Sequence, residues 1–361
     1  MKSKNDLCLL VMDSCADLGE KVNNELQKIR KVSTDFRTFV ESIKFNDGEG
    51  KALIKDSIRG KDVYILTDPH NYSITYNMHG QIHQTSPDEH FMDILRVISA
   101  TMGHAKQINV VMPLLYQSRQ HRRKSRESLD CATALQILQG MGVHEIITFD
   151  VHDPNIQNAT PLLAFDNFYP TNDLLKALLA KEKIDLNNIL VISPDIGAME
   201  RAKFLAKILR CDIGVFYKQR DVSKVVNGKN PIIDHKYLGN DVEGKTIIVV
   251  DDMLASGGSM LEVAEELKKR KADKIFFFTS FSLFSEGYDK FDEAYEKKLF
   301  NAIYSTNLNY VPDEILVKPW FNSVDCSLYL AKIIDCLNNE ESLYQLMEDN
   351  SAVTSYQNGE F

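Results

Sequence analysis

Short apolar runs alternate with segments of helical spacing along most of this 361-residue chain. The runs have the length of buried strands, and they include residues 7–12, 62–67, 107–112, 145–150, 188–193, 212–217, 246–250 and 274–281. Helical patterns lie between many of them, as at 91–103, 127–141, 171–183, 198–209 and 259–271. Continuous apolar strands that alternate with amphipathic helices indicate parallel sheets with helices on both faces. The sequence therefore predicts an α/β fold.

The composition limits the class of protein. The chain is 44% hydrophobic and 26% charged, and it is long enough for two α/β domains, each with its own core. The net charge of −9 argues against nucleic acid as a partner, and no apolar run approaches the length of a membrane span. The six cysteines form no CxxC pair, which is typical of reduced thiols. We expect a cytoplasmic protein.

The best domain boundary lies in residues 153–170, which contain three prolines and no helical period. The strand–helix rhythm is similar on both sides, which suggests an internal duplication. We expect domains at 1–165 and 166–338, followed by an acidic, frayed tail at 339–361.

Polar residues follow several of the predicted strands. The strand ends carry Asp150-Val151-His152, Ser193-Pro194-Asp195, Lys218-Gln219-Arg220 and Asp251-Asp252, and a basic segment follows Pro113. Ligands bind at the carboxyl ends of parallel strands in such folds, so these endings predict active-site clefts.

The stretch Thr246–Met260 combines a buried strand, two carboxylates, a glycine-containing turn and a helix start. Glycines let the backbone approach a ligand, and the N–H groups at a helix start attract anions. The aspartates suit a sugar diol or hydrated Mg2+. A plain strand–helix turn, with Asp as the helix cap, is the structural alternative.

This stretch resembles the phosphoribosyl-diphosphate loop of type I phosphoribosyltransferases and ribose-phosphate diphosphokinases. The resemblance implies a ribose 5-phosphate site made by Asp251, Asp252, Ala255, Ser256, Gly257, Gly258 and Ser259, with Arg220 beside it. Most synthases have an aspartate where this chain has Ala255. The 5-phosphate can still be held by backbone amides and hydroxyls, because an anion does not need that carboxylate.

Five of the nine residues in Ser118–Arg126 are Arg or Lys. A charge run is usually a solvated surface, but its place after a strand favours an anion-binding loop. The segment resembles that of ribose-phosphate diphosphokinases, in which Arg119 and Gln120 would contact ATP. Two features depart from the family pattern: His121 replaces an aspartate, and the loop is one residue short.

Two strand ends resemble the family's metal segments. His152 could instead complete the sheet end, and Asp195 could cap the following helix. The resemblance implies that both bind Mg2+. A pair of loop histidines, His79 and His83, has metal-ligand spacing, but Gly80 between them and the lack of a nearby third ligand favour plain loop residues.

Lys218 and Arg220 match a catalytic lysine and an arginine on a flexible segment of the family. Without that context they could be solvated charges. Cations over a transferring phosphoryl group would offset its growing charge.

Residues Asp47, Gly48 and Glu49 could form nothing more than a tight turn. They resemble a family turn that reaches the ATP of a neighbouring subunit. The resemblance therefore implies a homo-oligomer, either a hexamer or an assembly built from dimers.

The motifs occur in family order from about Leu7 to Leu337. The implied activity is transfer of the diphosphate of ATP to the C1 hydroxyl of ribose 5-phosphate, giving phosphoribosyl diphosphate and AMP for nucleotide biosynthesis. Two alternatives stay open. One is a non-catalytic regulatory paralogue that joins an active synthase, and the other is a phosphoribosyltransferase.

Overall fold

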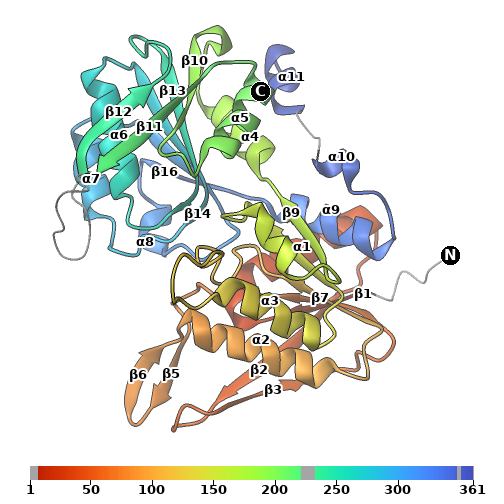
Figure 1. Cartoon of the computed structure of the whole chain (residues 1–361). Helices are drawn as coiled ribbons and strands as arrows, with labels where there is room; N and C mark the ends of the chain where they lie inside the picture. Colours follow the sequence, from red (N-terminus) through yellow and green to blue (C-terminus); the bar gives the residue numbers. More distant parts are fainter. Residues whose placement is uncertain (1–6, 221–231, 348–350, 361) are drawn as a thin grey trace. The chain divides into compact units, whose positions relative to one another are not determined.

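The computed structural model describes residues 7–220, 232–347 and 351–360. The chain forms two compact units (Figure 1). The first contains residues 1–170, 307–310 and 325–349, and the second contains residues 171–306, 311–324 and 350–361. The chain therefore passes repeatedly from one unit to the other. Each unit is built on one seven-stranded sheet.

The sheet of the first unit has the strand order β3-β2-β1-β4-β7-β8-β9. Its strands are β1 (Leu7–Val11), β2 (Arg37–Lys44), β3 (Gly50–Ile54), β4 (Asp62–Leu66), β7 (Gln107–Val111), β8 (Glu145–Phe149) and β9 (Ala164–Phe168). Only the β2–β3 pair is antiparallel. The helices α2 (Pro87–Thr101) and α3 (Asp130–Gly140) share one apolar core with this sheet. Helix α1 (Ala16–Arg30) packs against α9 (Ser327–Asn338).

The sheet of the second unit has the order β12-β11-β10-β13-β14-β15-β16. Its strands are β10 (Ile189–Ser193), β11 (Ile213–Arg220), β12 (Ile232–Leu238), β13 (Thr246–Leu254), β14 (Lys274–Ser282), β15 (Ala302–Thr306) and β16 (Phe321–Val324). Its helices are α4 (Thr171–Lys181), α5 (Met199–Leu209), α6 (Gly258–Lys269), α7 (Asp289–Glu296) and α8 (Asp313–Leu316). Again one edge pair, β11–β12, is antiparallel.

The two sheets have the same topology. In each sheet the first three strands along the chain lie in reverse order from one edge, as β3-β2-β1 and β12-β11-β10. The later strands then follow in chain order toward the other edge. The predicted α/β class with mainly parallel sheets is confirmed. The shared order also agrees with the suggested duplication, because two unrelated halves would have no reason to repeat it.

Helix α9 lies in the first unit, whereas the sequence placed it in the second domain. Polar contacts on a buried surface hold it there. The Arg30 guanidinium donates to Asp335 Oδ1 at 2.6 Å and to Asn338 Oδ1 at 2.8 Å, and Asn338 Nδ2 donates to Asp62 Oδ2 at 3.0 Å. Both Arg30 and Asp62 are buried, and buried charges need such partners.

Two expectations about irregular segments are wrong. Strand β9 lies within the supposedly irregular stretch 153–170, and it extends the sheet beside β8. The end of the chain is also more ordered than a frayed tail, because α10 (Tyr344–Met347) and α11 (Ser351–Gln357) are helical and α11 packs against α4. The Tyr356 hydroxyl donates to Ile184 O at 2.9 Å. Among the described residues, no helix is both long and apolar enough to cross a membrane.

Candidate active site

The acidic pair of the second unit lies on β13, near the carboxyl end of the strand. The sequence predicted that the strand would end at Val250, but β13 continues to Leu254 because its pairing with β14 runs on to Ser282. Asp251 and Asp252 therefore belong to the sheet. The turn that follows consists of Ala255, Ser256 and Gly257 alone, and α6 begins at Gly258. The loop that the sequence predicts for a sugar phosphate is thus short and fixed at both ends.

Gly257 occupies the N-cap position of α6 with a φ of 75°, a conformation that favours glycine. A Cβ placed on it would overlap Phe291 Cζ. No other residue fits without moving that buried ring. Ser259 is exposed in the first turn of α6, and Ser256 is partly buried. The positive end of the α6 dipole therefore meets two hydroxyl-bearing residues, an arrangement that would suit an anion.

The two aspartates lie side by side where burial disfavours their charged forms. Burial, together with the neighbouring charge of Asp252, raises the pKa of Asp251 well above its ordinary value. The Asp252 backbone N–H donates to Asp251 Oδ1 at 2.9 Å. Partial compensation comes from Arg201 on α5, whose Nη2 lies 3.5 Å from Asp252 Oδ2 with both side chains largely buried. A polyhydroxyl or cationic ligand would relieve the remaining excess.

Asp195 lies after β10, at the same end of the sheet. Its charge is among those that raise the pKa of Asp251, so the two carboxylates share one neighbourhood. One oxygen, Oδ1, accepts from Ala198 N at 3.1 Å, just before α5. This contact is the turn-capping role named as the structural alternative. Asp195 is exposed, so the contact leaves it accessible to a ligand.

Lys218 and Arg220 lie at the end of β11, where the backbone pairs with β12. Their side chains are outside the described residues. The sequence predicted that this strand would end at Tyr217, but β11 runs on to Arg220, so both positions belong to its last three residues. Because β11 is parallel to β10, their backbone lies at the carboxyl end of the sheet.

In the first unit, Arg119 and Gln120 follow β7 as expected. Both are exposed, and a turn fixes the backbone because Gln120 N donates to Gln117 O at 2.7 Å. Residues 122–126 form an exposed loop. Their backbone bends back at Glu127, whose carboxylate accepts from Ser125 Oγ at 3.0 Å. The predicted basic segment is therefore a surface loop beside the strand ends.

His152 follows β8, next to the start of that basic loop. Its backbone N–H donates to Ser118 Oγ at 3.0 Å, which ties the ends of β7 and β8 together. The His121 ring lies 5.3 Å from the His152 ring, and His121 Nε2 lies 3.3 Å from Asp153 Oδ2. Burial lowers the pKa of His121, so its imidazole is neutral near pH 7. The family's aspartate is thus replaced by an uncharged side chain.

Asp47, Gly48 and Glu49 form the turn between β2 and β3. Gly48 has a φ of +93°, and Asp47 Oδ1 accepts from Glu49 N at 3.0 Å. A second hairpin, β5 (Thr75–Met78) and β6 (Gln81–Gln84), lies against this turn, because His79 N donates to Asn46 O at 2.9 Å. His79 occupies the tip of that hairpin, whereas His83 lies on β6 rather than in a loop.

Sequence reasoning missed two residues of these sites. Arg201 has the spacing of an ordinary helix charge, and only its partner Asp252 reveals its role. His70 follows β4, and burial lowers its pKa to about 4, with a further lowering from the charge of Arg119. A strand-end rule applied to β4, as it was to the other strands, would have found His70.

Each unit brings part of the predicted set together. The second unit gathers Asp195, Asp251, Asp252, the 255–257 turn and the start of α6, and the first gathers Arg119, Gln120 and His152 around the ends of β7 and β8. The Asp47–Glu49 turn lies separately, at the end of the β2–β3 hairpin.

Comparisons with known proteins match both units. A family model of the N-terminal domain of ribose phosphate pyrophosphokinase covers residues 7–142, and a phosphoribosyl transferase domain model covers residues 171–314. The chain is 31% identical over 247 residues to a ribose-phosphate pyrophosphokinase of Burkholderia pseudomallei, which spans 68% of this chain and 70% of that protein. It is 28% identical over 304 residues to one of Shewanella oneidensis, covering 83% and 88%.

A solved structure agrees with this fold. The crystal structure of phosphoribosylpyrophosphate synthetase from Mycobacterium smegmatis superposes with a TM-score of 0.75 at 20% identity, over 93% of this chain and 99% of that one.

Proposed function

The chain belongs to the ribose-phosphate pyrophosphokinase family, and we propose on this premise that it makes 5-phosphoribosyl 1-diphosphate and AMP from ATP and ribose 5-phosphate. The C1 hydroxyl of the sugar would attack the β-phosphorus of ATP and lose its proton. The bond from that phosphorus to the oxygen of the α-phosphate would break, and AMP would leave.

The observation that carries the sugar assignment is the acidic pair beside Gly257. Two carboxylates with only partial compensation by Arg201 would accept hydrogen bonds from ribose hydroxyls. The short turn 255–257 would hold the 5-phosphate against the start of α6 through its amides and the hydroxyls of Ser256 and Ser259. In this assignment the loop would fix the position of the 5-phosphate, and the aspartates would fix the orientation of the ribose.

The first unit would bind ATP through Arg119 and Gln120. An arginine fork matches phosphate oxygens, and the exposed cations of residues 122–126 would offset the charge of the polyphosphate. Lys218 and Arg220 would act on the transferring group from the second unit. Cations near a phosphoryl group in transfer stabilise the charge that grows on its oxygens.

The donor set fits Mg2+ in the way that suits phosphate substrates. Among the described residues, no group of three or more His, Cys, Asp or Glu side chains could hold a metal alone. Mg2+ commonly binds through one or two carboxylates, water and substrate phosphates, so a single protein contact would suffice in each unit: partly exposed His152 in the first and exposed Asp195 in the second. Bound Mg2+ would neutralise phosphate charge, and the remaining steps depend on the protein's own cations.

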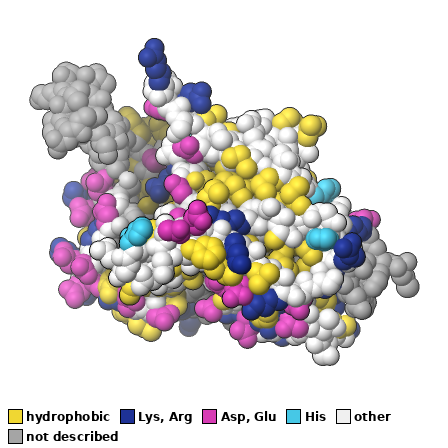
Figure 2. Space-filling model, turned by 90° about the horizontal axis from the view of Figure 1, so that it is seen from below, with side chains coloured by type: hydrophobic (Ala, Val, Ile, Leu, Met, Phe, Trp, Pro, Cys, Tyr) yellow, Lys and Arg dark blue, Asp and Glu magenta, His cyan; other side chains and the backbone are white. Residues whose placement is uncertain are grey.

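A homo-oligomer is part of the proposal. The Asp47–Glu49 turn is exposed and distant in sequence from Arg119, and in the assembly it would contribute to the ATP site of a neighbour. The first unit also exposes apolar side chains on β2 and β3, where Phe39 is 57% and Leu53 46% exposed. Apolar area interspersed with charges is visible on the face shown in Figure 2.

One assay tests the proposed reaction. The purified chain, incubated with ATP, Mg2+ and ribose 5-phosphate, should release AMP, and release should depend on the sugar. Formation of phosphoribosyl diphosphate should equal that of AMP. A folded chain that produces no AMP, but restores or changes the activity of a mixed synthase, would instead be a regulatory paralogue. Consumption of phosphoribosyl diphosphate with a nucleobase would identify a phosphoribosyltransferase.

A further inference from the structure

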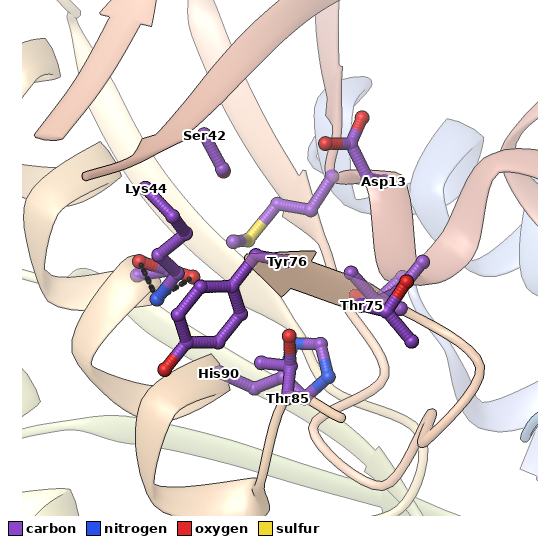
Figure 3. A pocket seen from close by; sticks show the side chains of 11 residues that line it. Asp13, Ser42, Lys44, Thr75, Tyr76, Thr85 and His90 are labelled. Carbon is purple, nitrogen blue, oxygen red and sulfur yellow. Dashed lines mark hydrogen bonds and ion pairs between the residues drawn. The ribbon is translucent and has the colours of Figure 1, made fainter. Parts of the chain in front are cut away.

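The β5–β6 hairpin is held in place although it adds little to the interior of the first unit. None of its residues, 75–84, is fully buried, and none belongs to the apolar core that α2 and α3 share with the sheet. The hairpin also borders a cavity of about 210 Å³, which Thr75 and Tyr76 help to line (Figure 3). A two-stranded hairpin is at best marginally stable by itself. Its position therefore depends on a few specific contacts.

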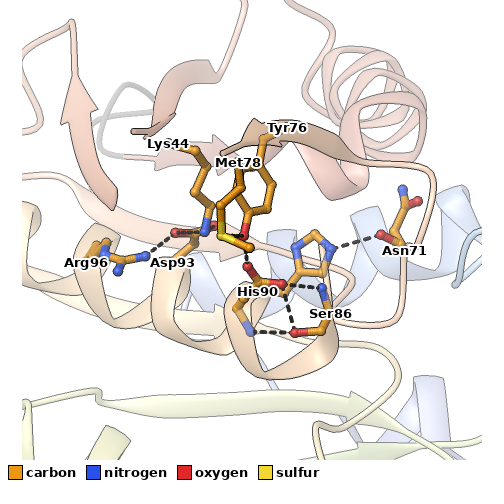
Figure 4. A network of polar contacts seen from close by, with 9 residues as sticks. Lys44, Asn71, Tyr76, Met78, Ser86, His90, Asp93 and Arg96 are labelled. Carbon is orange, nitrogen blue, oxygen red and sulfur yellow. Dashed lines mark hydrogen bonds and ion pairs between the residues drawn. The ribbon is translucent and has the colours of Figure 1, made fainter. Parts of the chain in front are cut away.

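Two side chains of β5 face the body of the unit. They are Tyr76 and Met78, which are half-buried, whereas the positions that alternate with them are exposed. The Tyr76 hydroxyl donates to Glu89 Oε1 on α2, and it lies 3.7 Å from Met78 Sδ. The Tyr76 ring also lies beside Lys44 of β2, whose Nζ is 5.6 Å from the ring centroid (Figure 4). Tyr76 therefore joins the hairpin to both a helix and the sheet.

Both partners of Tyr76 are themselves held in place. Glu89 Oε2 accepts from Ser86 N at 2.8 Å, which closes the capping box at the start of α2. Lys44 Nζ lies 3.0 Å and 2.9 Å from the two carboxylate oxygens of Asp93, and both side chains are more than nine-tenths buried. Arg96 Nη1 donates to the same carboxylate at 2.6 Å (Figure 4). The hairpin is thus attached to fixed points.

The tip of the hairpin reaches the Asp47–Glu49 turn at two places. His79 N donates to Asn46 O at 2.9 Å, at the start of the turn. Met78 Sδ covers Gly48, because a Cβ placed on that glycine would lie only 2.9 Å from the sulfur. A continuous series of contacts therefore runs from α2 through β5 to the turn.

The internal hydrogen bonds of the turn set its shape but not the direction in which it points. Gly48 N donates to Phe45 O at 3.0 Å, and Phe45 N donates to Glu49 O at 2.8 Å. Both bonds lie within the β2–β3 connection. Gly48 has no side chain with which to anchor the turn, so the support must come from a neighbour such as Met78.

We propose that the β5–β6 hairpin positions the Asp47–Glu49 turn for ATP, and that Met78 is the positioning residue. This inference rests on the proposed function, in which the turn contributes to the ATP site of a neighbouring subunit. A turn that is already held in its binding position loses less conformational freedom when ATP binds, so ATP binds more tightly. Met78 acts through the turn and does not itself touch ATP.

Calorimetric titration of the assembled full chain with ATP tests this proposal. Met78→Ala should weaken ATP binding about fivefold, because the turn loses its support at Gly48. The KM for ribose 5-phosphate should stay within about twofold of the parent value. Ile82→Ala is the matched control, because it removes an apolar side chain that is 80% exposed from β6 of the same hairpin, and it should change neither quantity. Equal ATP binding by Met78→Ala and the parent, or an equal loss in Ile82→Ala, would overturn the proposal.

Mixed assemblies distinguish positioning from a general loss of stability. Met78→Ala and Arg119→Ala chains with different tags are co-expressed, and assemblies that contain both are purified through both tags. Some sites then combine an intact Arg119 with an intact turn from the neighbour. The rate of AMP release at low ATP should therefore exceed the mean of the two separate variants about twofold or more. A rate equal to that mean would overturn the proposal.

The binding measurement also separates this inference from the proposed reaction. A parent chain that binds ATP but releases no AMP would refute the reaction, whereas weaker ATP binding by Met78→Ala alone would still support the role of the hairpin. A parent chain that binds no ATP would overturn both.

Discussion

Among the described residues, each unit contains on its sheet a pair of neighbouring carboxyl groups of which at least one is buried, and these two pairs lie at opposite ends of their sheets. Glu145 starts β8, and it hydrogen-bonds Asp166 on the neighbouring strand β9. Asp251 and Asp252 lie near the carboxyl end of β13. In both pairs, burial and the neighbouring acid raise a carboxyl pKa: that of Glu145 to about 9, and that of Asp251 well above its usual range.

The difference lies in how each pair is balanced. Glu145 remains protonated at neutral pH, so it shares a proton with Asp166. The pair therefore needs no ligand to offset its charge. The Asp251–Asp252 pair has Arg201 beside it and the exposed Asp195 in the same neighbourhood at the strand ends. Two carboxyl pairs with similar local chemistry therefore lie at different sheet ends, and in the proposed reaction only the pair at the carboxyl ends of the strands would face the substrates. The following predictions test that distinction, from the largest expected effect to the smallest.

Replacing one acid in each pair should separate the two roles. Asp251→Asn should lower kcat/KM for ribose 5-phosphate about 100- to 1,000-fold, because an amide is a weaker acceptor than a carboxylate for the sugar hydroxyls. Glu145→Gln should stay within about twofold of the parent chain, because its pair lies at the other end of a sheet. Initial rates of AMP release measure both. Similar losses in the two variants would contradict the comparison.

Removing the cation of the β13 pair should destabilise the second unit. Arg201→Ala leaves Asp252 buried beside Asp251 without that partner, which should cost about 3 kcal/mol of unfolding free energy, or roughly 6–12 °C in melting temperature. Lys207→Ala removes an exposed cation from the same helix and should change the melting temperature by about 1 °C at most. Thermal unfolding followed by circular dichroism gives both values. A small effect of Arg201→Ala would mean that the pair does not depend on Arg201.

An exposed cation of the first unit should behave in the opposite way. Arg119→Ala should raise the KM for ATP about tenfold, because a charge-assisted bond to phosphate is lost. It should leave the melting temperature within about 1 °C, because Arg119 is exposed. Steady-state kinetics at varied ATP, beside a melting curve, tests this. A variant that melts early but binds ATP normally would place Arg119 in the fold rather than in the site.

The smallest effect concerns pH and stability. Glu145 has a raised pKa in the folded chain, so the stability that its protonated form contributes is complete below its ordinary value of 4.5 and is lost as pH rises to about 9. Glu145→Gln removes this loss, so its melting temperature should fall less steeply between pH 5 and 9. Below about pH 4.5 this source of difference between the two chains disappears.

A control variant isolates the effect. Glu296→Gln, on the exposed surface of α7, should keep the slope of the parent chain. Some slope should remain even in Glu145→Gln, because the pKa of Asp68 is also raised, to about 6, by burial. Identical slopes in all three chains would show that Glu145 and Asp166 do not share a proton.

The sequence predicted the positions of the strand-end residues well, and for a physical reason. Apolar runs must lie in the sheet, and the first polar residue after a run emerges at its end. His152, Asp195 and Arg119 follow their strands as expected. Strand length was harder to predict, because pairing with β14 and not composition carries β13 past Asp251 to Leu254.

Contacts between distant residues could not be predicted from one sequence. The role of Arg201 depends on α5 lying against β13, and nothing in its spacing distinguishes it from a solvated charge. The β5–β6 hairpin was also missed, since its residues are mostly polar and its pattern lacks a buried face. The turn of that hairpin is formed by His79 and Gly80, which have positive φ values of 49° and 78°. In the sequence, Gly80 was the local signal of this turn.

Helix α9 has a consequence for how the chain is made. The first unit begins at the N-terminus, but the partners of its buried Arg30 and Asp62 are Asp335 and Asn338, near the other end. The ribosome must therefore synthesise the chain as far as Asn338 before the polar contacts of the first unit can be completed. Until then Arg30 has neither of these partners, and the first unit of the nascent chain stays incompletely folded.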